Sequence, residues 1–433
     1  MRLCIRFLAI ISFCCAAGCS DSGNNGQSDI VTDGSVVKSS LARNTTPQVS
    51  DTELAAAVTG NTEFALKLFP LLNSTPDNNT FFSPYSITQA FALLAPGARG
   101  TTLSEIEQLV FHSLPQTNRD SIFNKLDLLL SKKTSGAILE NGLQAPKLTN
   151  ANAVWGQKGF SILPAYLDTL AVNYGAGLHL VDFIAATEPS RQTINSWVEK
   201  QTNNRIKDLI PLNGVSSDTR LVLTNAIWFK ANWASQFSKD LTSNQTFTNH
   251  NSGMVSVPFM RQQFAVPYAN TSNCQAVDIP YAGDNLSMLV IMPDAGTFDA
   301  FIASLTPAVL ADITGHLSSQ MVNFSMPKFT FTTASSVDTI LRSLGMADTF
   351  SPARADLSGI DGERDLFVAA VFHQAFIGVD EVGTEAAAAT AITVGITSAP
   401  VPTLTLAIDH PFIFLIRDRQ TGSILFMGKV VSL

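Results

Sequence analysis

Apolar residues recur along the chain with two different periods, and the longest apolar runs lie in the second half of the sequence. Four stretches, 221–229, 286–292, 366–379 and 411–416, are almost continuously apolar over the length of a strand. Such runs are typical of strands that are buried on both faces. Helical spacing is found mainly ahead of them, so the pattern predicts an α+β protein with large mixed or antiparallel sheets.

Capping residues mark two helix starts in the first part of the chain. Ser83 and Pro84 offer a capping hydroxyl and a proline for the first turn, and apolar residues at helical spacing follow them. Thr102 and Glu105 have the spacing of a capping box. We therefore predict helices that begin near Ser83 and near Thr102.

The chain from Thr52 onward has the organisation of one domain. No second linker, internal repeat or charged spacer interrupts residues 52–433. Near the end, the turn residues Gln420-Thr421-Gly422 separate two strand-like stretches, 411–417 and 423–431, and predict a closing hairpin.

The N-terminus has the layout of a secretory signal. Arg2 and Arg6 precede an apolar stretch at 7–13, followed by small residues, which predicts a signal peptide over 1–18. The segment ending in Cys19 resembles the lipobox of bacterial lipoproteins, in which cleavage precedes the cysteine and its sulfur carries a diacylglycerol. An ordinary cleaved signal is the alternative.

The segment 19–51 is rich in Ser, Asn, Gly, Asp and Thr and lacks aromatic residues, so we expect a flexible polar tether. The protein is then exported and lipid-anchored to the cell envelope through Cys19, or else secreted. Cys274 is the one cysteine that neither the signal nor the lipid accounts for. The sequence therefore predicts no disulfide framework and a core that is stable without one.

Charge and motifs argue against several function classes. The 433-residue chain has a formal net charge of −8 and no basic run, so we expect no nucleic-acid partner. It also lacks the strong enzyme signatures for nucleophilic, metal-dependent and phosphate chemistry, and we expect neither a metal nor a cofactor. His373 lies within an apolar run, where a hydrogen-bonded core residue is a better interpretation than a general base.

The segment 382–400 has the most unusual composition in the chain. After Glu385 no charged residue occurs until Asp409, and Gly395 and Pro400 interrupt any membrane span or long helix. Small residues followed by β-branched ones are typical of a strand rather than a linker. Side chains this small on both faces suit a strand that must enter an already packed sheet.

Four blocks of this sequence, in the same order, resemble the serpin family. They cover nearly the whole chain from about residue 55 to 433, and the last two are the most specific. The blocks are Phe81-Phe82-Ser83-Pro84-x-Ser86-Ile87, then Asn225-Ala226-Ile227-x-Phe229-Lys230-x-x-Trp233, then the hinge Glu381-x-Gly383-Thr384-Glu385-Ala386-Ala387-Ala388-Ala389-Thr390, and finally Asp409-His410-Pro411-Phe412-Ile413-Phe414 with Phe426-Met427-Gly428-Lys429-Val430.

The resemblance implies a metastable fold of three sheets and eight or nine helices, with an exposed reactive loop over 383–404. It implies a monomeric, single-use inhibitor of an endopeptidase and not an enzyme. The target cleaves the loop and becomes acylated, and the loop then inserts into the large sheet and deforms the target's active site. A non-inhibitory serpin that acts as a binding or chaperone module is the alternative.

The resemblance also assigns roles to single residues. Trp233 is expected where the loop enters the sheet, and Lys328 is expected to pair with Glu381 at the base of the loop. A polar cluster is expected where the sheet parts, and its members are Ser83, Ser86, Asn225 and His373.

The position of the reactive bond depends on how the loop is counted. Counted from the hinge, the bond is Thr397–Ser398, with Ile396 and Ala399 as alternatives for the residue before the cut. Counted back from Pro411, it falls near Pro400–Val401. No charged or aromatic residue occurs from 386 to 408, so we expect an elastase-like or subtilisin-like serine protease as target, papain-like cysteine proteases as a second class, and trypsin-like enzymes as poor targets.

Overall fold

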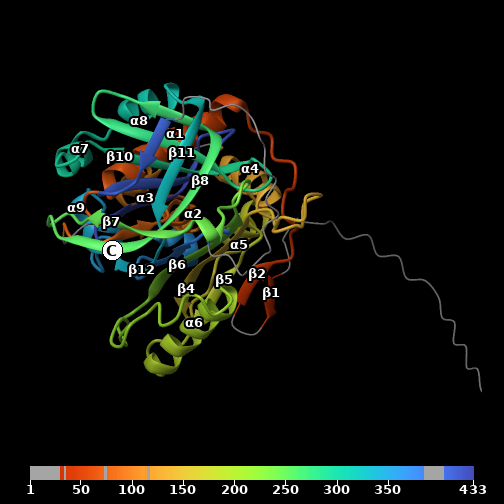
Figure 1. Cartoon of the computed structure of the whole chain (residues 1–433). Coiled ribbons are helices and arrows are strands. Elements are labelled where there is room, and N and C mark those ends of the chain that lie inside the picture. The colour runs from red at the N-terminus through yellow and green to blue at the C-terminus, as the bar shows by residue number, and fades with distance from the viewer. Residues whose placement is uncertain (1–29, 34–35, 73–75, 113, 115–117, 385–403) are drawn as a thin grey trace, which may run out of the picture.

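The computed structural model describes residues 30–33, 36–72, 76–112, 114, 118–384 and 404–433. Two large sheets and a set of mostly peripheral helices make up this part of the chain (Figure 1). The helices are α1 (Asp51–Leu68), α2 (Pro84–Leu94), α3 (Gly100–Val110), α4 (Arg119–Lys133), α5 (Pro164–Tyr174), α6 (Thr187–Gln201), α7 (Phe298–Ser304), α8 (Pro307–Gly315), α9 (Asp338–Ser343) and α10 (Ser358–Asp361).

The first sheet has eight strands of mixed direction. Strands β6 and β13 flank the short strand β14 and, beyond it, pair with each other in parallel. In spatial order the strands are β1 (Ile30–Asp33), β2 (Val36–Ser39), β5 (Leu178–Val181), β4 (Lys147–Gln157), β6 (Leu221–Asn232), β14 (Gly383–Thr384), β13 (Val368–Val379) and β12 (Phe329–Ser336).

The second sheet has nine strands, eight of them in one path. That path is β15 (Leu404–Ala407), β11 (Ser318–Pro327), β8 (Met254–Asn270), β9 (Cys274–Pro280), β10 (Leu286–Pro293), β16 (Phe412–Asp418), β17 (Ile424–Val430) and β3 (Thr80–Phe82), and β7 (Ser243–Thr248) pairs with β8.

The α+β class is confirmed, and the counts differ from the expectation for understandable reasons. Three sheets were expected, but β8 is 17 residues long and pairs with β7 over 254–259, with β11 over 259–268 and with β9 over 268–270, which joins these strands into a single network. Ten α-helices stand within the described ranges, where eight or nine were expected. The short helices α9 and α10 have six and four residues, too few for a periodic pattern.

The apolar runs are confirmed as β6, β10, β13 and β16, and the closing hairpin as β16 and β17. Ser83 caps α2 as predicted. The capping box at Thr102 is wrong, because α3 begins at Gly100 and both side chains serve another segment. The Thr102 hydroxyl accepts a hydrogen bond from the backbone of Asp356, and the Glu105 carboxylate accepts one from the backbone of Asp348.

The predicted tether over 19–51 is too long at its C-terminal end, since residues 36–50 pack on the domain. Strand β2 pairs with β5, and the guanidinium group of Arg43 lies 2.7 Å from the carboxylate of Asp127. Ser50 completes a capping box at the start of α1. Backbone pairing at a sheet edge and ionic contacts need few apolar side chains, so a polar composition did not prevent order here.

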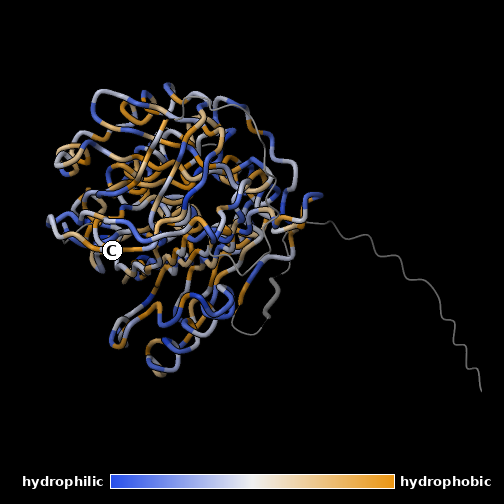
Figure 2. The backbone as a smooth tube through the Cα atoms, viewed as in Figure 1, coloured by the Kyte–Doolittle hydropathy of each residue, from blue (hydrophilic) through white to orange (hydrophobic). Residues whose placement is uncertain are grey.

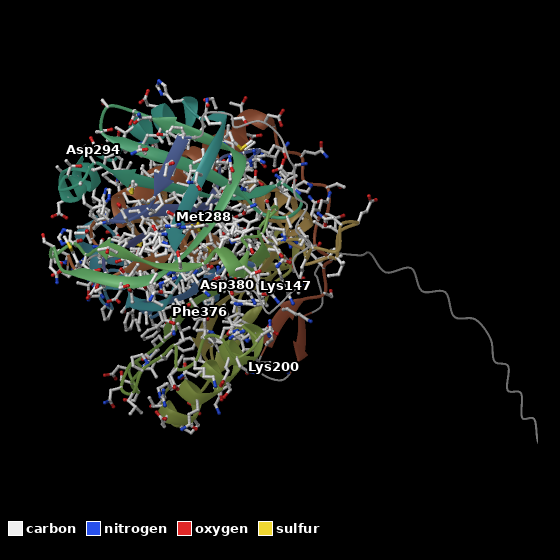
Figure 3. All side chains as sticks on the ribbon, viewed as in Figure 1. Lys147, Lys200, Met288, Asp294, Phe376 and Asp380 are labelled. Carbon is white, nitrogen blue, oxygen red and sulfur yellow. The ribbon has the colours of Figure 1, made fainter. Side chains whose placement is uncertain are left out.

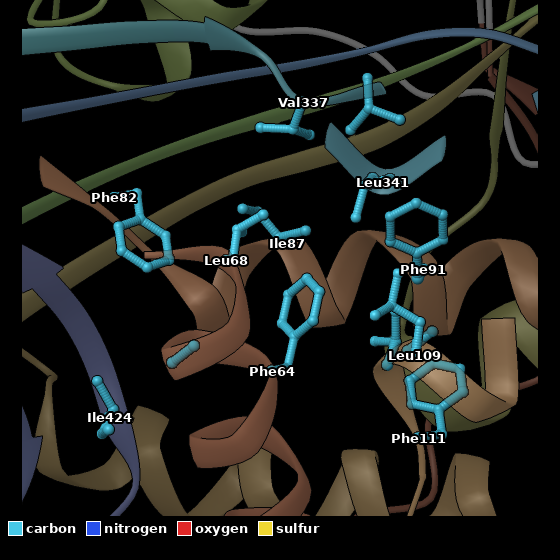
Figure 4. Close-up of a cluster of buried hydrophobic side chains, with 14 of the residues drawn as sticks. Phe64, Leu68, Phe82, Ile87, Phe91, Leu109, Phe111, Val337, Leu341 and Ile424 are labelled. Carbon is cyan, nitrogen blue, oxygen red and sulfur yellow. The ribbon is translucent and has the colours of Figure 1, made fainter. Parts of the chain in front are cut away.

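The core is divided by the first sheet. One cluster of buried apolar side chains lies between this sheet and α6, and two larger clusters fill the space between the sheet, the second sheet and the remaining helices. Figure 2 shows the apolar segments gathered inside the body of the molecule. Figure 4 shows part of the largest cluster, where Phe64 and Leu68 of α1 meet Ile87 and Phe91 of α2.

Among the described residues no single helix has the length and apolar character needed to cross a bilayer. The pair α7 and α8, bent by 107°, meets that test of length and composition only when the two are taken together.

Candidate functional site

The first sheet forks at one end, where the short strand β14 separates β13 from β6. We call the boundary between β6 and β13 the seam. Along the seam, the two strands pair in parallel as far as Ile227 and Ala375. Beyond that point Thr384 of β14 pairs antiparallel with Ala231 of β6 on one side and with Val379 of β13 on the other. A strand that is antiparallel to both neighbours therefore already occupies the top of the seam.

The fork depends on two residues of the predicted hinge. Gly383 approaches the backbone of β6 so closely that a Cβ atom in its place would lie 1.9 Å from the carbonyl oxygen of Ala231. Only glycine fits at this position. Thr384 is buried, and its hydroxyl lies 2.7 Å from the hydroxyl of Tyr281.

These positions correct the expected start and end of the exposed loop. Gly383 and Thr384 are buried in β14 and Leu404 lies in β15, because all three are paired with sheet strands. Several sequence predictions lie outside the described residues: the signal peptide 1–18, Cys19, and 385–403. The last range holds the hinge residues Glu385, Ala386, Ala387, Ala388, Ala389 and Thr390 and the reactive-bond candidates Ile396, Thr397, Ser398 and Ala399.

Trp233 lies at the fork, where the resemblance placed it. Its ring stacks on Tyr281, with the centroids 4.7 Å apart and the planes 6° from parallel. The indole Nε1 donates a hydrogen bond of 2.9 Å to the carbonyl of Asp380, and the backbone N–H donates one to the carbonyl of Val382. The chain entering β14 is thus held on one side by this aromatic pair.

The predicted ion pair between Lys328 and Glu381 is present, with 3.0 Å between Nζ and Oε2. The carboxylate is buried and also accepts a hydrogen bond of 2.7 Å from the hydroxyl of Thr242. Burial alone would raise the pKa of Glu381, but the Thr242 hydroxyl and the Lys328 ammonium group together hold it below its usual value. Glu381 is therefore ionised near neutral pH, which anchors the base of the segment.

Further down the seam, polar side chains form a row across three strands. Asn152 of β4, Asn225 of β6 and His373 of β13 are cross-strand neighbours in register. The side-chain amide of Asn225 donates hydrogen bonds of 2.8 Å to the hydroxyl of Ser86 and 2.9 Å to the side-chain oxygen of Asn152. The polar cluster expected where the sheet parts therefore lies across the parallel pairing of the seam.

The cluster also ties the sheet to helix α2. The Ser83 hydroxyl accepts from the backbone of Ser86 and donates a hydrogen bond of 2.6 Å to the carbonyl of Leu425 in β17. The backbone N–H of Ser83 donates to Nε2 of His373, so Nδ1 carries the proton and donates to the side-chain oxygen of Asn225. All four predicted members of the cluster are thus connected.

His373 is a neutral, buried member of this network. Burial lowers its pKa to about 3, which leaves the imidazole uncharged at physiological pH. A general base would need a pKa nearer to the working pH. The prediction of a hydrogen-bonded core histidine is confirmed.

Sequence reasoning missed three contributors to the site. Asn150 and Asn152 both contact the hydroxyl of Ser86, and Tyr281 supports Trp233 and Thr384. The two asparagines alternate with alanines in a strand whose second half is mostly apolar, which is a detectable signal. Tyr281 directly follows strand β9, and nothing in the sequence pattern marks it.

Within the described ranges, no group of three His, Cys, Asp or Glu side chains could hold a metal ion. Cys274 is buried, and burial raises the pKa of its thiol, which disfavours the reactive thiolate.

Comparison with known proteins agrees with this geometry. Residues 59–433 match the family model for Serpin (serine protease inhibitor). An uncharacterized serpin-like protein of Thermococcus kodakarensis is 39% identical over 82% of this chain and 81% of its own length, and the human leukocyte elastase inhibitor is 37% identical over 86% and 98%. The crystal structure of the thermophilic serpin tengpin in its native state superposes with a TM-score of 0.79 at 28% identity, covering 91% of this chain and 98% of tengpin. The chain therefore belongs to the serpin family.

Proposed function

We propose that this serpin is a single-use inhibitor that traps an endopeptidase by inserting its own cleaved loop into the first sheet. Serpins are mostly protease inhibitors rather than catalytic enzymes, although some are non-inhibitory. The observation that carries the proposal is the fork. Strand β14 already lies antiparallel to both β6 and β13 at the point where the loop begins.

The register of β14 defines where further residues would go. If the pairing of Thr384 continues unbroken, each step along the loop moves one step back along both neighbours. Ala388 then lies between Ile227 and Ala375. These two residues are now each other's partners in the parallel pairing, so the inserted strand and the present pairing exclude one another.

The same register places Thr390 between Asn225 and His373, in the polar cluster. A hydroxyl at this position can replace the contacts that these two side chains lose when the seam opens. Ala386 and Ala388 would point to the same face as Thr390, toward the packed interior. Small side chains are what that face admits without overpacking.

Insertion also improves the backbone hydrogen bonding of the sheet. It replaces one parallel strand pairing by two antiparallel ones, and antiparallel pairing is slightly the more stable of the two. The loop can insert fully only after it is cut, because its far end continues into β15 of the second sheet. Cleavage by the target therefore releases the transition.

The chemical step belongs to the target. Its nucleophilic hydroxyl, deprotonated by the adjacent base, attacks the carbonyl carbon of Thr397, the bond to Ser398 breaks, and the new amine takes the proton. An ester between the two proteins remains. Insertion of the loop then carries the acylated protease away from its docked position and deforms its active site before water can hydrolyse the ester.

The residues before the cut define the target class. The uncharged, small and aliphatic residues from Ile396 to Ala399 suit the small apolar pocket of elastase-like and some subtilisin-like proteases. The pocket of trypsin-like enzymes holds a buried carboxylate that these side chains leave unpaired. Similarity to the human leukocyte elastase inhibitor supports the same class.

The test is to mix the protein with an elastase-like enzyme, subtilisin, papain and trypsin, and to examine the products by denaturing electrophoresis and mass spectrometry. We expect an SDS-stable covalent complex with the first two, little with trypsin, and a released peptide that begins at Ser398. Loop cleavage by every protease without a covalent complex would favour the alternative, a non-inhibitory binding or chaperone module.

We also propose that the protein is exported and anchored to the cell envelope by a diacylglycerol on Cys19. The N-terminal sequence supports this. A radiolabelled fatty acid should be incorporated into the wild-type chain and not into a Cys19→Ala variant, which should leave the membrane fraction. Equal distribution of both variants would instead indicate an ordinary cleaved signal.

A further inference from the structure

A basic groove of about 810 Å³ lies on the outer face of the first sheet, beside the fork. Its lining includes the aromatic residues Trp228 on β6 and Phe376 on β13 and the charged residues Arg205, Lys230, Lys328 and Asp380. Figure 3 shows Phe376 and Asp380 in the same region of the molecule as Lys147 of β4.

Positive charge in this groove is only partly compensated. Lys328 pairs with Glu381, and Asp380 accepts hydrogen bonds from the backbone N–H groups of Val382 and Gly383. Lys230 has no ion-pair partner among the residues that the structure describes.

The strand beside Lys230 adds a second positive charge. Lys147 of β4 is its cross-strand neighbour in register, and like charges in directly opposite positions destabilise a sheet. The groove also leaves a hydrogen-bond donor without a partner. Trp228 is only 6% exposed, and its buried Nε1 has no hydrogen-bond partner within the described ranges.

We infer that this groove is the docking site for the side chain of Glu385 when the loop inserts, an inference that rests on the proposed function. The register of β14 places position 385 between Lys230 and Gly378. Directly opposite side chains in an antiparallel pair lie about 4.5–5.5 Å apart at Cβ, within reach of an ion pair.

The strand on the other side leaves space for the carboxylate. Gly378 has no side chain of its own, and the nearest atoms to a Cβ placed there are the Thr330 hydroxyl at 3.3 Å and the edge of the Phe376 ring at 3.8 Å, a polar group and an ordinary apolar contact. The next outward-facing position, Ala387, falls between the rings of Trp228 and Phe376, where a small residue avoids both.

Docking of Glu385 biases the sheet toward the inserted state. A carboxylate beside Lys230 compensates the repulsion between Lys147 and Lys230. This position lies just beyond the last parallel pair, Ile227 with Ala375, and the strand that carries Glu385 is held there on both sides along its length once the loop has inserted below it. Glu385, the acidic residue that follows Glu381 in the hinge, thus has a specific binding site at Lys230. The small residues that follow Glu385 need only be small enough to pack without overlap.

A double-mutant cycle tests the docking. Glu385→Gln, Lys230→Gln and the double variant are compared as native and as loop-cleaved protein by thermal unfolding in guanidinium. In the cleaved form we expect each single change to lower the unfolding midpoint and the double change to lower it no further, with a coupling of about twofold to fivefold in the unfolding equilibrium constant. In the native form the two changes should be independent.

The same variants give a kinetic readout. Slower insertion gives water more time to hydrolyse the ester and release the protease. Each single variant should therefore consume more inhibitor molecules per covalent complex than the wild-type chain. The double variant should consume no more inhibitor than either single variant. The exchanged pair Glu385→Lys with Lys230→Glu should restore the wild-type value. Lys200→Gln, which removes an exposed lysine of α6 outside the groove, is the charge-matched control.

Independent effects of the two substitutions in the cleaved form would overturn this inference while leaving the proposed function intact. Equal coupling in native and cleaved forms would overturn it as well, since the pair would then not depend on insertion. A wild-type chain that gains no stability on loop cleavage would overturn both.

Discussion

At the scale of single residues, the amide of Asn225 holds the polar cluster together. It accepts from His373 across the seam, donates to Ser86 of α2, and donates to Asn152 on the neighbouring strand β4. We expect Asn225→Ala to lower the free energy of unfolding of the native form by about 2 kcal/mol, because buried polar groups lose their partners. Chemical denaturation measures the change.

The matched control is Asn244→Ala, which removes an exposed asparagine from strand β7. It should change the unfolding midpoint by very little. If both variants were equally stable, the cluster would contribute nothing to holding the seam closed.

His373 should make the native form sensitive to mild acid. Burial lowers its pKa to about 3, whereas an imidazole in the unfolded chain titrates near pH 6.5. Between these two values the unfolded chain binds more protons, so the free energy of unfolding falls as the pH drops from about 6.5 toward 3.

We expect this site to account for a loss of about 1–2 kcal/mol between pH 7 and pH 5, which His373→Gln should remove. Urea unfolding at the two pH values measures it. His112→Gln, a change at an exposed histidine outside the polar cluster, is the control. An identical slope for the wild-type and His373→Gln chains would contradict the assignment.

At the scale of elements, the two faces of the inserting strand should tolerate different side chains. If the loop inserts in the register of β14, as proposed, Ala386 faces the packed interior and Ala387 faces the basic groove. We expect Ala386→Glu to convert the inhibitor into a substrate, because an unpaired carboxylate would have to enter the interior. Ala387→Glu carries the same charge to the open face and should keep most of the complex yield.

The yield of SDS-stable complex per cleaved molecule measures the difference. Equal loss in both variants would show that the loop inserts in another register or not at all. Thr384→Arg is a less selective change, since Thr384 is already buried beside Tyr281 in the uncut chain and the variant should disturb the native fork too.

How far the sequence predicts this site depends on the kind of contact. Motifs identified the residues whose type is accepted at only a few positions of the fold. These are the hinge glycine, Trp233 and the Lys328–Glu381 pair. Asn150, Asn152 and Tyr281 act through neighbours on other strands, and single-chain periodicity does not show which strands are neighbours. The edge strands β1 and β2 were missed because their order comes from backbone pairing within a polar stretch.

At the scale of the whole molecule, cleavage of the loop should raise the thermal stability by tens of degrees. The native sheet holds a parallel pairing at the position where the proposed mechanism inserts an antiparallel strand. On that mechanism the uncut fold is kinetically rather than thermodynamically favoured. Differential scanning calorimetry of native and loop-cleaved protein compares the two. Equal midpoints after clean cleavage would exclude insertion and support the binding-module alternative.

The placement of the tryptophans has an optical consequence. The chain has four of them, and all lie on the first sheet or on the helix that covers it: Trp155 on β4, Trp197 on α6, Trp228 on β6 and Trp233 just beyond the end of β6. The emission of Trp233 should respond to the fork, because its indole N–H is bonded to the carbonyl of Asp380, three residues before β14. Near-ultraviolet excitation therefore reports selectively on this sheet, and the protein can be followed through its transition in real time without an attached dye.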